Sequence, residues 1–132
     1  MMTEPRAKVF DYAVELDADG TMAIPDGAGF VPPGEWTADH LLLAALLRCS
    51  LDSLAYHARR AGSTARASGS ASGRVTKRES DGRYAFAEID VRVEATLEQP
   101  VADPQALVAK AERDCFVGSS LTVRPRYDWQ LA

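Results

Sequence analysis

The sequence predicts an α+β fold with the element order β-β-α-β-β-α-β. Two kinds of pattern lead to this class. Short alternating segments joined by turn signals such as Asp81-Gly82 are typical of hairpins, and two longer segments carry helical caps and helical spacing. Because hairpins dominate, we do not expect a doubly wound parallel sheet. The length of 132 residues suits one hydrophobic core, so we expect a single domain over residues 1–132.

Composition excludes several classes of protein. Fifteen Lys and Arg against 19 Asp and Glu give a net charge of −4, which argues against a nucleic-acid partner. No uninterrupted apolar run approaches the ~20 residues that span a bilayer, and residues 1–6 contain no apolar signal segment. We therefore expect a cytoplasmic protein with no membrane partner. Two cysteines and two histidines are too few for a disulfide scaffold or a zinc site, so we expect no metal and no cofactor.

The first 36 residues predict two short strands and a loop. Residues 8–24 alternate imperfectly around a turn signal at residues 17–20. Residues 25–36 contain three prolines and three glycines, and we expect them to form a loop.

A long helix is predicted over residues 37–61, with Thr37 as N-cap, Asp39 in the first turn and Gly62 as the C-terminal stop. Residues 41–47 are apolar around the whole circumference, which is typical of a helix buried on most sides. A helix of ~36 Å exceeds the interior of so small a protein. The sequence therefore favours an oligomer.

Residues 62–73 allow two interpretations. Their Gly, Ala and Ser content is typical of a flexible linker, but small residues fall on one parity, which indicates a strand with a small-residue face that a helix can approach closely. We favour the strand. After the Asp81-Gly82 turn a second strand follows, with alternate residues from Ile89 to Leu97 facing inward and a bulge expected near Ala87.

Asp103-Pro104 marks the start of a second helix, which we expect to end before Gly118. Its apolar face would include Leu107, Val108, Ala111 and Cys115. Residues 121–131 predict a closing strand that Pro125 interrupts, which favours an edge position.

Two cysteines are the main candidates for chemistry. Cys49 lies in the middle of the long helix and Cys115 at the end of the second helix, and an unpaired cysteine is most often an inert buried residue. The helix itself offers Cys49 little activation. Asp52 opposes a thiolate and Arg48 points to another face, so a reactive Cys49 needs a cation from elsewhere.

The two histidines are weaker candidates. Neither His40 nor His57 can reach Cys49 within the same helix, since His57 is ~12 Å further along the axis. We expect both side chains to be solvated.

Two segments resemble signatures of the OsmC/Ohr family. Residues 37–49, Thr-Ala-Asp-His-Leu-Leu-Leu-Ala-Ala-Leu-Leu-Arg-Cys, are similar to the family's acidic residue followed by an alanine-rich helix with a cysteine ten residues later. Residues 111–121, Ala-Glu-Arg-Asp-Cys-Phe-Val-Gly-Ser-Ser-Leu, are similar to the stretch around the family's second cysteine. The order of the other elements also agrees, so the resemblance covers residues 8–131.

The resemblance implies an OsmC-like fold in an intertwined homodimer, with long central helices and sites at the subunit interface. Well-studied branches of the family are cysteine-based peroxidases that reduce organic hydroperoxides or hydrogen peroxide and are recycled by an external dithiol reductant. By position, Cys49 would be the peroxidatic thiol and Cys115 the resolving thiol. Asp39 matches a glutamate that holds an arginine against the thiolate, and Arg6 and Arg48 are candidates for that arginine.

Geometry adds that Asp39 and Cys49 are ~15 Å apart on one helix and can cooperate only through a partner subunit. Two alternatives remain open: a divergent member that binds a small apolar ligand at the dimer interface without turnover, and a structural dimer with inert cysteines.

Overall fold

The computed structural model describes residues 7–132, and the chain divides into two compact units, residues 1–37 and 38–132. Arg6 lies outside the described residues. The expectation of a single domain over residues 1–132 stays a prediction.

The first unit contains a small antiparallel sheet of three two-residue strands, in the order β1-β2-β3: β1 (Glu15–Leu16), β2 (Met22–Ala23) and β3 (Gly29–Phe30). Strand β3 lies inside residues 25–36, so the expectation of a loop there was wrong at this point. The physical reason is a close approach, because a Cβ on Gly29 would lie 2.7 Å from the backbone oxygen of Met22. Glycine alone allows that pairing.

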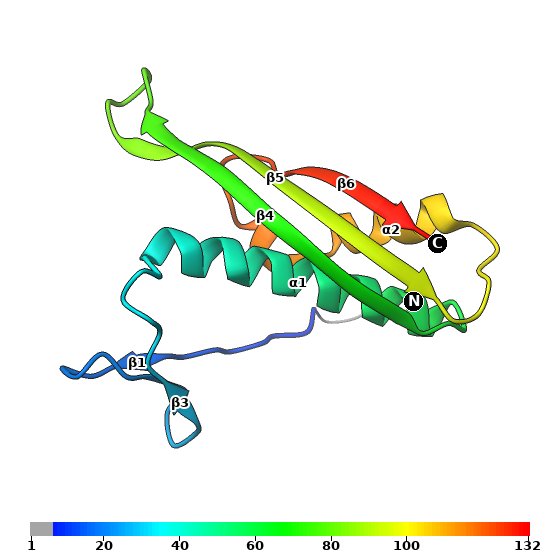
Figure 1. Cartoon of the computed structure of the whole chain (residues 1–132), viewed down its shortest axis with the longest axis horizontal. Helices are drawn as coiled ribbons and strands as arrows, with labels where there is room; N and C mark the ends of the chain where they lie inside the picture. The colour runs from blue at the N-terminus through cyan, green and yellow to red at the C-terminus, as the bar shows by residue number, and fades with distance from the viewer. Residues whose placement is uncertain (1–6) are drawn as a thin grey trace, which may run out of the picture. The chain divides into compact units, whose positions relative to one another are not determined.

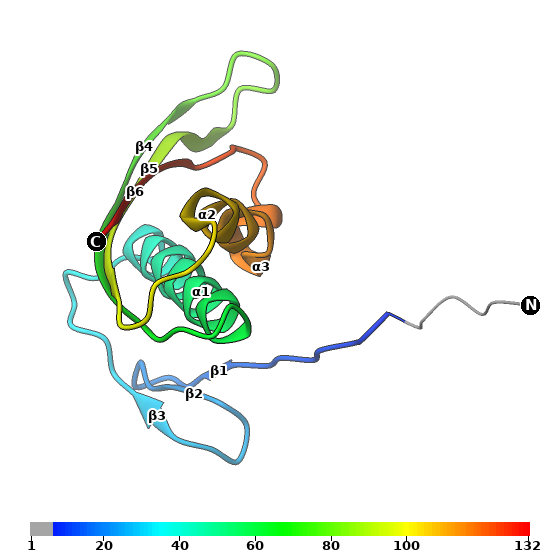
Figure 2. The same ribbon diagram turned by 90° about the vertical axis from the view of Figure 1, so that its right-hand side faces the viewer.

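The second unit is a layer of helices on one face of a three-stranded sheet (Figures 1 and 2). The helices are α1 (Ala38–Arg60), α2 (Pro104–Arg113) and α3 (Phe116–Ser119). The strands are β4 (Ala65–Lys77), β5 (Tyr84–Leu97) and β6 (Arg126–Leu131), in the order β4-β5-β6. Strand β5 is antiparallel to β4 and parallel to β6. The α+β class is confirmed.

The long β4–β5 hairpin confirms the strand interpretation of its first half and excludes the linker. A Cβ on Gly69 would lie 3.1 Å from the Cδ1 atom of Leu47, so small residues on β4 do allow α1 to approach the sheet. The register shifts at one point: Arg74 pairs with Glu88, and Val75 pairs with Phe86. The predicted bulge at Ala87 is therefore confirmed.

One hydrophobic core lies between the sheet and the helices. Its fully buried apolar residues all belong to the second unit: Leu46, Leu54, Ala58, Ile89, Val91, Val93, Ala95, Leu107, Ala111 and Cys115. The predicted inward face of β5 is thus confirmed. The core draws on α1, β5 and α2, and it encloses the second cysteine.

The second helix is shorter than predicted. Asp103 caps α2 by accepting a hydrogen bond from the Ala106 N–H at 3.1 Å, but α2 ends at Arg113. Cys115 leaves the helical conformation and becomes the N-cap of α3, where its Sγ accepts a hydrogen bond from the Gly118 N–H. A polar contact of this thiol therefore interrupts the helix that apolar spacing alone had extended.

The closing strand begins at Arg126, after Pro125, and pairs with β5 alone. Its edge position is as predicted, but residues 121–125 are not part of it. Proline cannot donate a ladder hydrogen bond, which explains why pairing starts one residue later.

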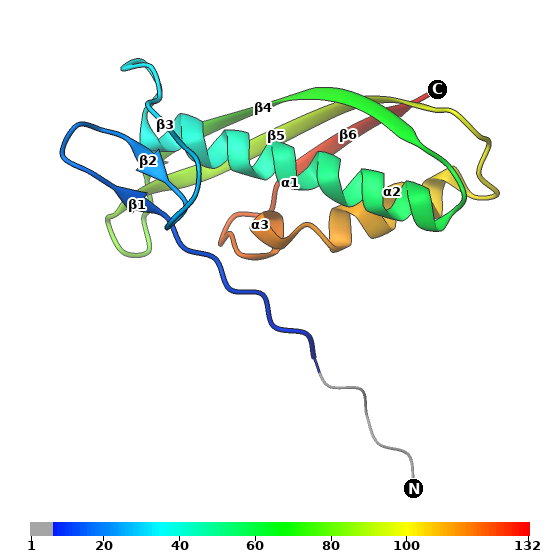
Figure 3. The ribbon, with the colours of Figure 1, turned by 90° about the horizontal axis from the view of Figure 1, so that it is seen from below.

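Helix α1 is only partly covered in the single chain. Of the apolar residues 41–47, only Leu46 is fully buried. Among the described residues, α1 is also long and apolar enough by length and composition to cross a membrane, a property shared with core helices of soluble proteins. The sequence expectation differed because it counted uninterrupted apolar residues, whereas α1 contains Arg48 and Asp52. Helices α2 and α3 lie along α1 (Figure 3).

Candidate functional site

The two cysteine side chains meet where α1 packs against the junction of α2 and α3. Cys49 is half-buried on α1 and packs against the core that contains the fully buried Cys115, and the Cys115 side chain is near enough to act on the Cys49 pKa. Both thiols are free. The fold therefore brings together two sulfur atoms that are 66 residues apart in the sequence.

The surroundings of Cys49 favour the neutral thiol. Burial raises the pKa of Cys49 above its ordinary value, and the neighbouring Cys115 raises it further. The backbone N–H groups of Val117 and Phe116 act in the opposite direction, because they stabilise a thiolate. The groups that set this pKa include no cation.

Arg48 does not reach the thiols. Its side chain is 87% exposed and lies 3.9 Å from the Asp52 carboxylate, one turn further along α1. This placement agrees with the expectation that Arg48 points to a different face from Cys49. A cation for Cys49 would have to come from outside the 38–132 unit or from another chain.

Asp39 lies in the first turn of α1 and is exposed. At 1.5 Å per residue it is about 15 Å from Cys49 along the helix. It does not act on the Cys49 pKa within this chain. Its predicted role at the thiol stays a prediction that involves a partner chain.

Two hydroxyl groups beside Cys115 were missed by the sequence analysis. The Ser50 Oγ lies 3.6 Å from the Cys115 Sγ and 2.9 Å from the Tyr127 hydroxyl. The available signal was helical spacing, because Ser50 falls between Leu46 and Leu54 on the buried face of α1. A buried serine in such a stripe requires a hydrogen-bond partner.

His57 also differs from its expectation. Its side chain is only 11% exposed, and its Nε2 lies 2.8 Å from the Asp114 carboxylate, next to Cys115. The Arg113 guanidinium, helped by His57, lowers the pKa of Asp114 to about 2. His57 is therefore not solvated: it ties α1 to the α2–α3 junction. His40 is exposed, as predicted.

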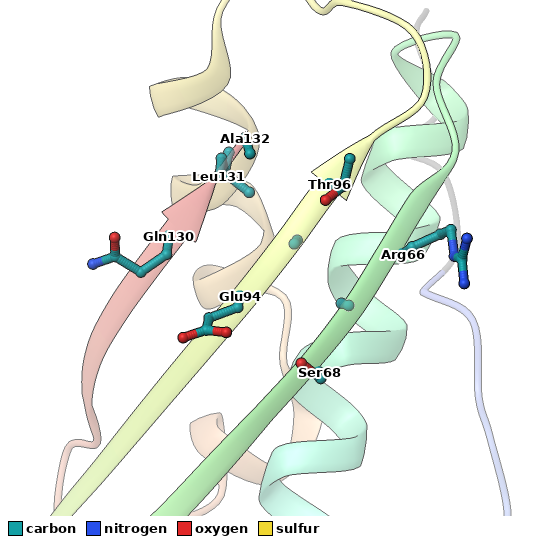
Figure 4. A pocket seen from close by; sticks show the side chains of 9 residues that line it. Arg66, Ser68, Glu94, Thr96, Gln130, Leu131 and Ala132 are labelled. Atoms are coloured by element: carbon teal, nitrogen blue, oxygen red, sulfur yellow. The ribbon is translucent and has the colours of Figure 1, made fainter.

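Two pockets of the second unit lie over the sheet and beside α2. A hollow of about 630 Å³ lies over the outer face of the sheet, lined by residues such as Arg66, Glu94 and Gln130 (Figure 4). Another, of about 430 Å³, is lined by α2, by the segment before β6 and by Tyr127. The leucines of α1 line neither of them. Over residues 7–132, no cluster of three or more His, Cys, Asp or Glu side chains could hold a metal ion.

Solved structures share this fold. An OsmC-like protein of unknown function from Vibrio cholerae superposes with a TM-score of 0.68 at 13% identity, over 83% of this chain and 82% of that one. An OsmC-like protein from Mycoplasma pneumoniae superposes with a TM-score of 0.67 at 15% identity, over 96% of this chain and 99% of that one. The organic hydroperoxide resistance protein OhrB of Bacillus subtilis superposes with a TM-score of 0.56 at 18% identity, over 92% of this chain and 96% of that one.

Sequence comparison gives the family. No curated protein matches the chain. The profile of the OsmC-like protein family, however, matches residues 32–130, which include both cysteines and every element of the second unit except the last residue of β6. The chain belongs to the family of OsmC-like proteins.

Proposed function

We propose that the protein is a thiol-dependent peroxidase that reduces organic hydroperoxides or hydrogen peroxide. The observation that carries this proposal is the proximity of the Cys49 and Cys115 side chains in the packed core. Two free thiols in contact can be oxidised to a disulfide without a large rearrangement of the chain. Organic hydroperoxide resistance proteins among the structures of similar fold support the choice of substrate.

The reaction has two steps. The Cys49 thiolate attacks the outer oxygen of the hydroperoxide and becomes a sulfenic acid, and the alcohol leaves after taking up a proton. The Cys115 thiol then attacks the Cys49 sulfur, and a disulfide and water form. An external dithiol reduces the disulfide and returns both thiols. The N–H groups of Phe116 and Val117 favour the thiolate that the first step requires.

The missing cation is supplied by a homodimer in this proposal. Leucines of α1 remain half-exposed in the single chain, which supports a second chain covering them. Across such an interface, Asp39 of one protomer holds an arginine against the Cys49 of its partner, and Arg6 is a candidate for that arginine. The protein would work in the cytosol, where dithiol reductants are available.

The test is peroxide consumption with a dithiol reductant by the wild type and by the variants Cys49→Ser and Cys115→Ser. We expect turnover in the wild type, none in Cys49→Ser, and a trapped sulfenic acid in Cys115→Ser. Equal and negligible rates in all three proteins would show that the proposal is wrong. Serine is a close steric match for cysteine, so each variant removes the thiol with little change in volume.

The raised pKa of Cys49 favours a second candidate, an OsmC-like protein that binds a small apolar ligand at the dimer interface without turnover. One additional measurement, the melting temperature with and without an apolar ligand, distinguishes the two candidate functions. A protein without peroxide turnover whose melting temperature rises with an apolar ligand would support the second candidate.

A further inference from the structure

The hydroxyl of Ser50 has three partners and only one proton. The carbonyl oxygen of Leu46, at 2.8 Å, can only accept, so Ser50 donates its proton there. The Ser50 oxygen then accepts from its two other partners, the Tyr127 hydroxyl and the Cys115 thiol. In the resting protein Ser50 thus holds the Cys115 thiol as a proton donor.

Tyr127 lies between Ser50 and a pocket. Its hydroxyl is bonded to Ser50 on one side, and its side chain lines the pocket of about 430 Å³ that also includes Glu112, Arg113 and Arg124. Burial raises the pKa of Tyr127 to about 12, and Cys115 and Glu112 contribute to the rise, so at neutral pH the phenol keeps its proton. Ser50 and Tyr127 form a hydroxyl pair between a fully buried thiol and a polar pocket.

We propose that Ser50 and Tyr127 are positioning residues of the resolving step, in which they carry the proton of the Cys115 thiol to the pocket. This inference rests on the proposed function. Cys115 is fully buried and has no basic side chain in hydrogen-bond contact among the described residues. The Ser50–Tyr127 pair is a hydrogen-bonded route from this thiol to the pocket.

The Cys115 sulfur forms the bond to the Cys49 sulfur, and the S–O bond of the sulfenic acid breaks. For this step the Ser50 hydroxyl turns from the Leu46 carbonyl to the Tyr127 oxygen, and the Tyr127 hydroxyl turns from Ser50 toward the pocket. The proton of Cys115 then passes to the Ser50 oxygen, the Ser50 proton passes to the Tyr127 oxygen, and the Tyr127 proton passes to the pocket. The departing hydroxide takes up a proton from solvent, and the net products are the disulfide and one water molecule.

The test compares Tyr127→Phe and Ser50→Ala with the wild type after one equivalent of cumene hydroperoxide. Quenching with a sulfenic-acid probe and mass spectrometry follow the two steps separately. We expect sulfenic acid to form at the wild-type rate in Tyr127→Phe and the disulfide to form about a hundredfold more slowly, the lower end of the range for loss of a proton-transfer group. The deficit should shrink as pH rises, because hydroxide replaces the relay.

Ser53→Ala is the matched control. Ser53 is also a buried serine of α1 bonded to a carbonyl, that of Ala111 at 2.7 Å, but it does not contact Cys115. A merely structural loss of a helix contact would slow both kinds of variant and leave the pH profile unchanged. Disulfide formation in Tyr127→Phe at the rate and with the pH profile of Ser53→Ala would overturn the inference.

Oxidation with diamide separates this inference from the proposed function. Diamide adds to the Cys49 thiol, and Cys115 then displaces the hydrazine, so the Cys115 proton must leave although no peroxide takes part. A slow displacement in Tyr127→Phe supports the relay even if the wild type does not reduce peroxides. A wild type that forms no Cys49–Cys115 disulfide with diamide, or variants that form it equally fast, would overturn it.

Discussion

Cys49 is a thiol that its own chain keeps largely protonated, since burial and the neighbouring thiol outweigh two backbone N–H groups. A peroxidatic cysteine needs the thiolate, because that is the nucleophile. Among residues 7–132 the chain therefore provides the partner for resolution, but no cation acts on the Cys49 pKa. In the proposed dimer, the activating cation comes from the second chain.

Asp114 gives a prediction for stability in acid. The pKa of Asp114 is lowered to about 2 by Arg113 and then by His57, below its ordinary value of 3.8. The ionised carboxylate therefore stabilises the fold above about pH 4, and this contribution is lost as pH falls from 4 toward 2. Because the carboxylate is partly exposed, solvent screens the effect.

We predict that Asp114→Asn lowers the free energy of unfolding at pH 7 and that the difference from wild type disappears by about pH 2. Urea denaturation at a series of pH values measures it. Asp128→Asn, on the exposed face of β6, is the control and should track the wild type more closely. A difference that stays constant over this pH range would contradict the assignment.

At the candidate site, the two cysteines could be predicted from the sequence, but the residues that contact them could not. The resemblance singled out Cys49 and Cys115, whereas helical spacing placed Cys115 within a longer helix. Ser50 and Tyr127 are 77 residues apart, and His57 and Asp114 are 57 apart, so no local pattern joins them. Pairings of this kind depend on how α1 packs against the other elements, which spacing does not determine.

Strand β4 makes contact with α1 because one of its positions has no side chain. A Cβ on Gly69 would lie 2.3 Å from the backbone oxygen of Arg92 and 3.1 Å from the Leu47 side chain. The backbone oxygen cannot move without disturbing the β4–β5 pairing. This position is therefore closed to every residue except glycine unless the hairpin shifts.

We predict that Gly69→Ala lowers the free energy of unfolding by about 1–3 kcal/mol, the usual cost of overpacking. Gly34→Ala is the matched control, since a Cβ there meets nothing within 4 Å and its backbone is not left-handed. Chemical denaturation of both variants measures the difference. Equal stability of the two variants would show that α1 and the hairpin are not closely packed at Gly69.

Elements whose neighbouring residues form a clear pattern were predictable. Elements that depend on contacts with residues distant in the sequence were not. The alternation of β5, the bulge at Ala87 and the cap at Asp103 follow from neighbouring residues. Strand β3 escaped prediction because two residues carry no periodicity, and its pairing depends on β2. The end of α2 was missed because apolar spacing does not reveal that Cys115 caps α3, where its sulfur accepts a hydrogen bond from the Gly118 N–H.

Apolar side chains of α1 remain partly exposed in the single chain. Leu42 is half-buried but is not among the residues packed against the core, unlike its neighbour Leu43. A second chain that covers this surface would also supply the cation that Cys49 lacks. Assembly and reactivity of the thiol are therefore expected to change together.

We predict that the wild type sediments as a dimer and that Leu42→Glu shifts it toward the monomer, because a charge would be buried at the interface. The midpoint of Cys49 alkylation against pH should move to higher pH in this variant, since the activating cation is lost. Thr96→Glu, on the outer face of the sheet, is the control. A monomeric wild type, or an unchanged midpoint in a monomeric variant, would contradict this account.

The central claim is that folding places Cys49 and Cys115 within reach of one bond. The most direct measurement is peptide mapping of the reduced protein after one equivalent of an organic hydroperoxide. We predict that a peptide pair linked by a Cys49–Cys115 disulfide forms and that dithiothreitol reverses it. Two free thiols after peroxide treatment, or Cys49 oxidised further while Cys115 stays reduced, would contradict the claim.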